Sequence, residues 1–207
     1  MFIIKKPDCE MLKAVVKELK AGAVMVFPTD TAYGLGCDAT NARAVAKIFK
    51  IKGRAAGKAL PMIVADADMA KHFFAVKAPD AKLAAQFWPG PLSIILAAKP
   101  AVVKTALAKG TAAVRVPALE LARTLSKRLG RPLVATSANL SGAPACYSIR
   151  AFLGQAKNMK TRPELVIDAG ALRRRRPSTI VRAAKSGTME VLRKGPIKIV
   201  GGLDIRH

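Results

Sequence analysis

The chain has 207 residues, enough for one sizeable domain, and 51% of them are hydrophobic. Its apolar runs are all shorter than the ~20 residues that a membrane-spanning helix needs. The first charged residue, Lys5, follows only three apolar side chains after Met1, too few for the apolar centre of a secretory signal. We therefore expect a single cytoplasmic domain over residues 1–207, with no membrane segment.

The most pronounced compositional feature is positive charge. The sequence holds 36 Lys and Arg against 13 Asp and Glu, a formal net charge of +23. Residues 121–207 alone carry 18 basic and 4 acidic side chains. Such a field attracts polyanions, including RNA and nucleotides, although basic residues also serve solubility. Charge by itself therefore predicts an anionic partner without naming it.

Hydrophobic periodicity predicts alternating helices and strands in the first part of the chain. An apolar stripe with helical spacing begins after Asp8, a good N-cap, and stops at Gly22. A short apolar run at 23–27 then predicts a buried strand, and a second helix follows over 41–51 with Asn41 as its cap. The same patterns predict helices at 69–74, 79–87 and 119–129 and strands at 60–64, 92–98, 113–116, 133–135, 165–167, 179–181 and 189–192. This order favours an α/β domain whose twisted sheet mixes parallel and antiparallel strands and is flanked by helices.

Polar segments that follow strands are the candidate sites, because open α/β sheets bind ligands at strand ends. Residues 28–36 offer two hydroxyls, a carboxylate, a phenol and two glycines, but an ordinary strand-to-helix turn uses the same residues. Residues 136–142 combine hydroxyls, an amide and backbone N–H groups, which suits an anion or a ribose. Arg115 lies within a predicted strand, where a lone arginine usually faces solvent. No GxxxxGK[ST] or GxGxxG pattern is present, so a nucleotide would bind by another scheme.

Residues 50–58 contain four cations at a predicted helix end, where the helix dipole already favours positive charge. The apolar strand that follows would nevertheless place Lys52 and Arg54 beside the sheet. A lysine point charge and an arginine fork together suit phosphate or carboxylate. The segment is therefore a second candidate for anion binding.

Cysteine and histidine give no metal-binding pattern. The three cysteines, Cys9, Cys37 and Cys146, are far apart, and His72 and His207 are the only histidines. We expect buried or partly buried free thiols and no metal ligands from protein side chains.

Seven short segments in chain order resemble the YrdC-domain family of threonylcarbamoyl-AMP synthases. They are PTDTAYGLG at 28–36, KGR at 52–54, WPGPL at 88–92, VRVP at 114–117, ATSANLSG at 135–142, PSTIV at 177–181 and LRKG at 192–195. The resemblance covers about residues 23–195. The chain ends soon afterwards, which resembles the short bacterial-type form.

The resemblance implies a fold, a reaction and partners. The fold is a twisted mixed sheet around a basic concave cleft. The enzyme combines L-threonine, bicarbonate and ATP into threonylcarbamoyl-AMP and pyrophosphate, with Mg²⁺ on the leaving group. A separate transferase complex then modifies N6 of adenosine 37 in tRNA, and contact with tRNA or other RNA is an open expectation.

The family motifs also assign residues to roles. Lys52 and Arg54 would be catalytic, and L-threonine would be held by Thr31, Arg115 and Ser178. The residues that would bind ATP are Lys58, Thr111, Thr136, Ser137, Asn139 and Arg193.

Some positions depart from the family pattern. Ala55 stands where proline is usual, and Ser93 replaces a common threonine but keeps the hydroxyl. The run Arg173 to Arg176 is unusual and would serve RNA docking or solubility. Two other hypotheses remain beside the synthase, since a net charge of +23 would serve them as well. One is a non-catalytic RNA-binding or ribosome-associated protein of this fold, and the other is a paralogue that acts on another carbamoyl-type substrate.

Overall fold

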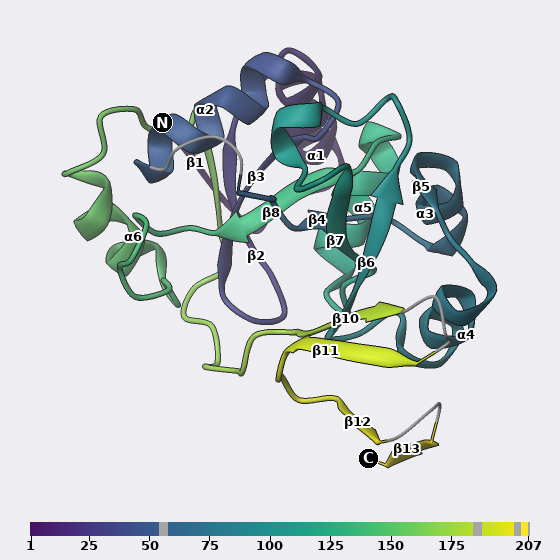
Figure 1. The fold of residues 1–207 in the computed structure, drawn as a ribbon. Helices are drawn as coiled ribbons and strands as arrows, with labels where there is room; N and C mark the ends of the chain where they lie inside the picture. Colours follow the sequence, from purple (N-terminus) through teal and green to yellow (C-terminus); the bar gives the residue numbers. More distant parts are fainter. Residues whose placement is uncertain (54–57, 184–187, 201–203, 207) are drawn as a thin grey trace.

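The computed structural model describes residues 1–53, 58–183, 188–200 and 204–206 (Figure 1). One large sheet dominates these residues, with strands in the spatial order β1-β9-β2-β3-β8-β4-β7-β6-β10-β11 and β5 paired to β6. Its strands are β1 (Phe2–Lys5), β2 (Met25–Pro28), β3 (Tyr33–Asp38), β4 (Met62–Ile63), β5 (Phe74–Ala75), β6 (Leu92–Ala98), β7 (Thr111–Arg115), β8 (Leu133–Ser137), β9 (Leu165–Asp168), β10 (Thr179–Ala183) and β11 (Met189–Arg193). A separate pair, β12 (Lys198–Val200) and β13 (Asp204–Arg206), lies near the C-terminus.

The sheet is mixed, as the sequence predicted. The pairs β1/β9, β9/β2, β4/β7 and β6/β10 are parallel, whereas β2/β3, β3/β8, β8/β4, β7/β6, β6/β5 and β10/β11 are antiparallel. Neighbouring strands are often distant in sequence, so the centre of the sheet joins segments from the whole chain.

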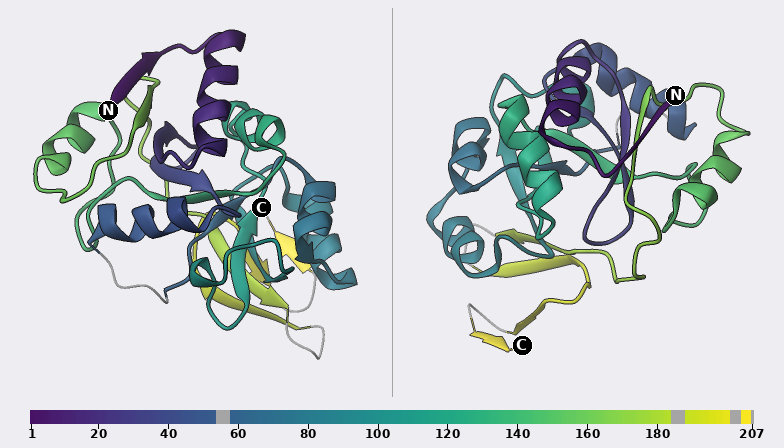
Figure 2. Two further views of the ribbon diagram at one scale, coloured as in Figure 1. Left: turned by 90° about the horizontal axis from the view of Figure 1, so that it is seen from above. Right: turned by 180° about the vertical axis from the view of Figure 1, so that it is seen from behind.

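Helices cover both faces of this sheet. They are α1 (Cys9–Lys20), α2 (Ala42–Lys52), α3 (Ala67–Phe73), α4 (Ala78–Phe87), α5 (Glu120–Leu129) and α6 (Ile149–Ala156), with a short 3₁₀ turn η1 (Lys104–Ala106). Seen from behind in Figure 2, α1 and α5 lie together in front of the sheet. Within the described residues, no helix combines the length and apolar character needed to cross a bilayer.

Local chemistry explains where the first two helices begin. The Asp8 carboxylate accepts a hydrogen bond from the Met11 N–H at 2.8 Å, and the Asn41 amide oxygen accepts one from the Ala44 N–H at 3.1 Å. Each cap satisfies an N–H group that the helix leaves unpaired. Both predicted caps are confirmed.

Alternating strand side chains build two hydrophobic clusters, one on each face. Met25 and Phe27 of β2 join the cluster of α1 and α5, whereas Val26 points into the larger cluster, to which α2 also contributes. In β4, Ile63 and Met62 divide in the same way. This period of two is what a sheet buried on both faces requires.

The prediction of a loop over residues 28–36 was wrong in part. The chain turns at 29–32 and returns as β3, antiparallel to β2, so it forms a hairpin and leads to no helix. The glycines there allow close packing: a Cβ at Gly36 would lie 2.7 Å from both the Phe27 ring and the Val134 carbonyl oxygen. The sequence also did not reveal β1 or α6.

Candidate functional site

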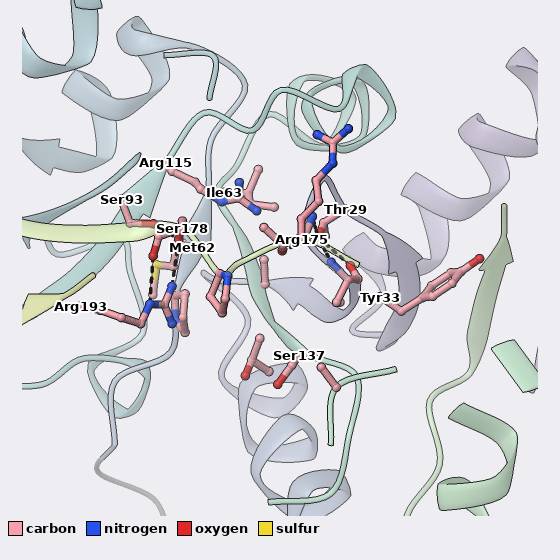
Figure 3. Close-up of a pocket in the computed structure, with 18 of the residues that line it drawn as sticks. Thr29, Tyr33, Met62, Ile63, Ser93, Arg115, Ser137, Arg175, Ser178 and Arg193 are labelled. Carbon is pink, nitrogen blue, oxygen red and sulfur yellow. Dashed lines mark hydrogen bonds between the residues drawn. The ribbon is translucent and has the colours of Figure 1, made fainter. Parts of the chain in front are cut away.

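A cavity of about 380 Å³ opens where several separate segments meet (Figure 3). Its walls come from the β2–β3 loop, β4, the ends of β7 and β8, the segment before β10 and the end of β11. The polar residues that line it are Thr29, Thr31, Tyr33, Ser93, Arg115, Thr136, Ser137, Tyr147, Arg175, Ser178 and Arg193. This set contains three arginines and no carboxylate.

Arg115 is the last residue of β7 and is only 8% exposed, so the general expectation that a strand arginine faces solvent was wrong here. Its Nη1 donates to Asp30 Oδ2 at 2.7 Å, and the backbone N–H of Ala118 donates to the same oxygen at 3.4 Å. Asp30 therefore fixes one edge of the guanidinium. Among the described residues, the other N–H groups of Arg115 have no hydrogen-bond partner, which leaves them for a ligand.

The β2–β3 loop presents hydroxyl groups to the cavity. Thr29 Oγ1 donates to the Ala32 carbonyl at 2.6 Å and lies 3.1 Å from Thr31 Oγ1. A threonine that bonds its own turn makes the turn rigid. Thr31, one of the predicted threonine-binding residues, therefore lines the cavity from a fixed loop.

Ser178 and Arg193 form another part of the wall. Arg193 donates from Nε to the Ser178 carbonyl and from Nη2 to Ser178 Oγ, both at 2.9 Å. Ser93 Oγ lies 2.9 Å from the same hydroxyl. Burial lowers the pKa of the Arg193 guanidinium, and the positive charge of Arg115 lowers it further. An anion in the cavity would relieve this repulsion.

Lys52 is absent from the cavity lining but donates hydrogen bonds to Ser137 and Asn139; we call this region, Lys52 with residues 136–139, the floor of the cavity. The Lys52 side chain is 4% exposed at the end of α2, and Nζ donates to the Ser137 carbonyl at 2.6 Å and to the Asn139 carbonyl at 3.0 Å. The Asn139 side-chain oxygen accepts from both Lys52 and the Ser137 hydroxyl. The ammonium thus holds together the segment that carries Thr136 and Ser137, which do line the cavity.

Two other predicted site residues, Thr111 and Lys58, lie outside the cavity lining. Thr111 starts β7 and Arg115 ends it, roughly 13 Å apart at the usual rise per residue, and the Thr111 hydroxyl donates to Ala108. The structure therefore does not bring Thr111 to the cavity, because a strand separates its two ends. Lys58 is exposed and is not among the lining residues. Arg54 lies outside the described residues.

Of the lining residues, Tyr147 was not singled out from sequence, and Arg175 was noted only within the run assigned to RNA docking or solubility. Arg175 belongs to the arginine run, and Tyr147 lies after the TSANLSG segment, with its ring 5.4 Å from the Arg174 guanidinium carbon. The only available indication was that the run directly precedes the PSTIV motif. Charge composition could not show which arginine faces the cavity.

The described residues contain no cluster of three or more His, Cys, Asp or Glu that could hold a metal ion. Cys37 and Cys146 are buried, and burial raises the pKa of both thiols. Cys9 is exposed, so the expectation of buried or partly buried thiols fails for this one.

The fold and cavity have counterparts in known proteins. A family model described as telomere recombination, covering Sua5, YciO and YrdC proteins, matches residues 17–195. The chain belongs to the Sua5/YciO/YrdC family. This finding confirms the resemblance seen in the motifs.

Several proteins of this family are similar to the chain over most of its length. Threonylcarbamoyl-AMP synthase of Pyrococcus abyssi is 37% identical over 166 residues, 79% of this chain, but the chain spans only 48% of that protein. A relative of the same name in Vibrio vulnificus is 34% identical over 190 residues, which cover 89% of this chain and 98% of the relative. The structure of P. abyssi Sua5 complexed with L-threonine matches 95% of this chain and 57% of that one, with a TM-score of 0.83 and 30% identity.

Proposed function

We propose that this Sua5/YciO/YrdC protein makes threonylcarbamoyl-AMP and pyrophosphate from L-threonine, bicarbonate and ATP. The supporting observation is one cavity lined both by the residues expected to hold threonine and by several expected to hold ATP: Thr31, Arg115, Ser178, Thr136, Ser137 and Arg193. The names of the relatives support the same activity.

Threonine would bind on the side of Arg115. The guanidinium edge not used by Asp30 suits a carboxylate, since arginine binds carboxylates through paired hydrogen bonds. The Thr31 and Ser178 hydroxyls lie around the same cavity and suit the amine and hydroxyl of an amino acid. The related Sua5 structure with L-threonine supports this class of ligand.

The chemistry then needs positioning more than covalent help from the protein. The threonine amine forms an N–C bond with the carbon of bicarbonate, and water leaves. A carbamate oxygen attacks the α-phosphorus of ATP as the bond to pyrophosphate breaks. Such phosphoryl transfer is accelerated by alignment and by fixed positive charge near the developing negative charge.

Lys52 would contribute mainly by fixing Ser137 and Asn139, because its ammonium already donates to both residues. Arg54 and Lys58 remain our candidates for phosphate contacts from the segment after α2. Thr111 is not part of the proposed site, given its place at the far end of β7.

Mg²⁺ would enter with the triphosphate. The described residues that line the cavity include no carboxylate, and Mg²⁺ in nucleotide sites is often held largely by phosphates and water. We infer that Mg²⁺ shields the negative charge of the leaving pyrophosphate.

We also infer that a separate transferase complex in the cytoplasm takes threonylcarbamoyl-AMP and transfers its threonylcarbamoyl group to tRNA.

Pyrophosphate release tests the proposal. Purified protein, with ATP and Mg²⁺, should release pyrophosphate only when L-threonine and bicarbonate are both present, and mass spectrometry should find threonylcarbamoyl-AMP. Release that ignores threonine would contradict the proposal. Release with a different amine would indicate the paralogue, and tight RNA binding without release would indicate the non-catalytic RNA-binding protein.

A further inference from the structure

The segment that joins β9 to β10, residues 169–178, forms no helix or strand and contributes Arg175, Pro177 and Ser178 to the cavity lining; we refer to it as the connecting segment. In Figure 1 it runs below the β2–β3 loop to reach β10. It carries the four consecutive arginines, 173–176, and all four are exposed. Only Arg175 among them lines the cavity.

Both ends of the connecting segment are fixed by hydrogen bonds. At its start, the buried Tyr33 hydroxyl accepts from the Ala169 N–H at 2.9 Å and donates to the Gly170 carbonyl at 2.7 Å. At its end, Ser178 is held by Ser93 and Arg193. These contacts fix the path of the backbone that presents Arg175.

Tyr147 fixes the middle of the connecting segment. Its carbonyl accepts from the Leu172 N–H at 2.7 Å, and the Arg174 guanidinium lies over its ring at 5.4 Å. Arg174 is therefore engaged with an aromatic face. Arg175, the next residue, makes no hydrogen bond or ion pair within the part of the chain that the structure describes.

The three lining arginines thus differ in how much of each guanidinium the protein already uses. Arg115 is paired with Asp30. Arg193 uses two N–H groups on Ser178, drawn as dashed lines in Figure 3. Arg175 is exposed at the edge of the cavity, which we call the rim, and its whole guanidinium is without a partner among the described residues. A triphosphate brings several negative charges, more than the partly engaged arginines match, and arginine forks bind phosphate in a bidentate manner.

We propose that Arg175 binds the terminal phosphates of the nucleotide, the part that leaves as pyrophosphate. This inference rests on the proposed function for its substrate but concerns a residue that the family motifs do not include. Arg175 would stabilise the bound triphosphate and the leaving group at the cavity rim. AMP lacks those phosphates and would not contact it.

The experiment is calorimetric titration of the full chain with Mg-ATP, inorganic pyrophosphate and AMP. Arg175→Ala should weaken binding of ATP and pyrophosphate about tenfold and leave AMP affinity unchanged. Arg173→Ala removes the same charge from the same exposed run without touching the cavity lining, so it should bind all three ligands as the parent does. The difference should shrink at high salt, because the site is exposed.

Equal losses in Arg173→Ala and Arg175→Ala would overturn the proposal, since they would report only the general positive field. Equal losses for AMP and ATP, or no loss for Arg175→Ala, would also overturn it. Thermal unfolding of each variant shows whether the fold is intact. Normal ATP binding without pyrophosphate release would refute the proposed function alone, whereas normal release with unchanged ATP binding in Arg175→Ala would refute this inference alone.

Discussion

Two regions around the cavity use their polar groups in opposite ways. In the floor, the Lys52 ammonium donates to Ser137 and Asn139, so it is engaged in holding a loop. At the rim, Arg175 has no protein partner among the described residues. The floor is therefore built before any ligand arrives, whereas the rim is available to respond to one.

This difference separates structural from ligand-binding cations. A buried charge is tolerated only when hydrogen bonds compensate for lost water, which explains why Lys52 carries several. An exposed arginine has no such requirement. A motif lysine can therefore be essential through the loop it holds, even where its ammonium does not line the cavity.

The largest effect is expected for the floor. Lys52→Met would leave the carbonyls of Ser137 and Asn139 without their donor, so we expect pyrophosphate release to slow by about a hundredfold, or ~3 kcal/mol of barrier. The free energy of unfolding should also fall by about 3 kcal/mol, because a buried partner is removed. Urea unfolding and the release assay measure the two effects.

Lys50→Met is the matched control, because Lys50 lies in the same helix but is exposed. It should change neither quantity noticeably. If Lys52→Met kept full stability but lost activity, Lys52 would be a ligand-binding residue and the contrast between floor and rim would fail.

Arg115 lies between these extremes: it is buried and paired with Asp30, but its other N–H groups have no partner in the part of the chain that the structure describes. Arg115→Lys keeps the charge but cannot hold Asp30 and a carboxylate through one planar fork, so the KM for threonine should rise about tenfold. The KM for ATP should change little. Threonine titrations in the release assay measure this difference.

Arg131→Lys provides the control, since Arg131 also pairs with a buried aspartate, Asp38, at 2.7 Å but lies outside the cavity lining. It should leave the KM for threonine unchanged. A rise in the KM for ATP alone on Arg115→Lys would place Arg115 in the nucleotide half of the site.

The sequence predicted most of the fold because most of its causes are local. Caps at Asp8 and Asn41 and the apolar run of β6 can be recognised within a few residues. β3 was missed because Gly34 and Gly36 resemble a flexible loop, whereas their role is to admit the Phe27 ring.

The site was predictable only in part, because its contacts join distant segments. Motifs identified Arg115, but its partner Asp30 lies 85 residues earlier, and no local pattern marks such a pair. Arg175 was visible only as charge, because the contacts that direct it depend on Tyr33 and Tyr147. Thr111, which the motifs assigned to ATP, does not line the cavity, because a strand presents its two ends to different surroundings.

A smaller effect concerns the support of the rim. Tyr33→Phe removes the hydroxyl that bonds Ala169 and Gly170, so we expect about 2 kcal/mol lower free energy of unfolding. Burial raises the pKa of Tyr33, so the phenol stays protonated and donating at neutral pH. ATP affinity should fall by less than it does in Arg175→Ala, because Arg175 itself remains.

Tyr147→Phe is the control for stability, because the Tyr147 hydroxyl makes no hydrogen bond within the described residues while its ring stays in place. Urea unfolding of both variants gives the comparison. Equal destabilisation by the two substitutions would show that the Tyr33 hydroxyl does not specifically anchor the connecting segment.

The smallest effect is expected for an ion pair between α2, the helix that ends at Lys52, and the residue before β9, the strand that leads into the connecting segment. Lys47 of α2 donates to Glu164, just before β9, at 2.6 Å, and the Val24 N–H donates to the same carboxylate at 2.8 Å. Burial alone would raise the pKa of Glu164, but these hydrogen bonds outweigh it and the pKa is lowered. The stabilisation is therefore fully present above the ordinary glutamate pKa of about 4.3, and it is lost as pH falls from there through the lowered pKa of the folded protein.

Both side chains of this pair are more than a third exposed, 37% for Lys47 and 43% for Glu164, so solvent screening limits the gain to about 0.5 kcal/mol. Glu164→Gln keeps an acceptor for the Val24 N–H but removes the charge. Urea unfolding should show the variant less stable by that amount at pH 7 and equal to the parent near pH 3. A difference that persisted at pH 3 would contradict this prediction. It would mean that packing and neutral hydrogen bonds at residue 164, and not its charge, stabilise the contact between α2 and the residue before β9.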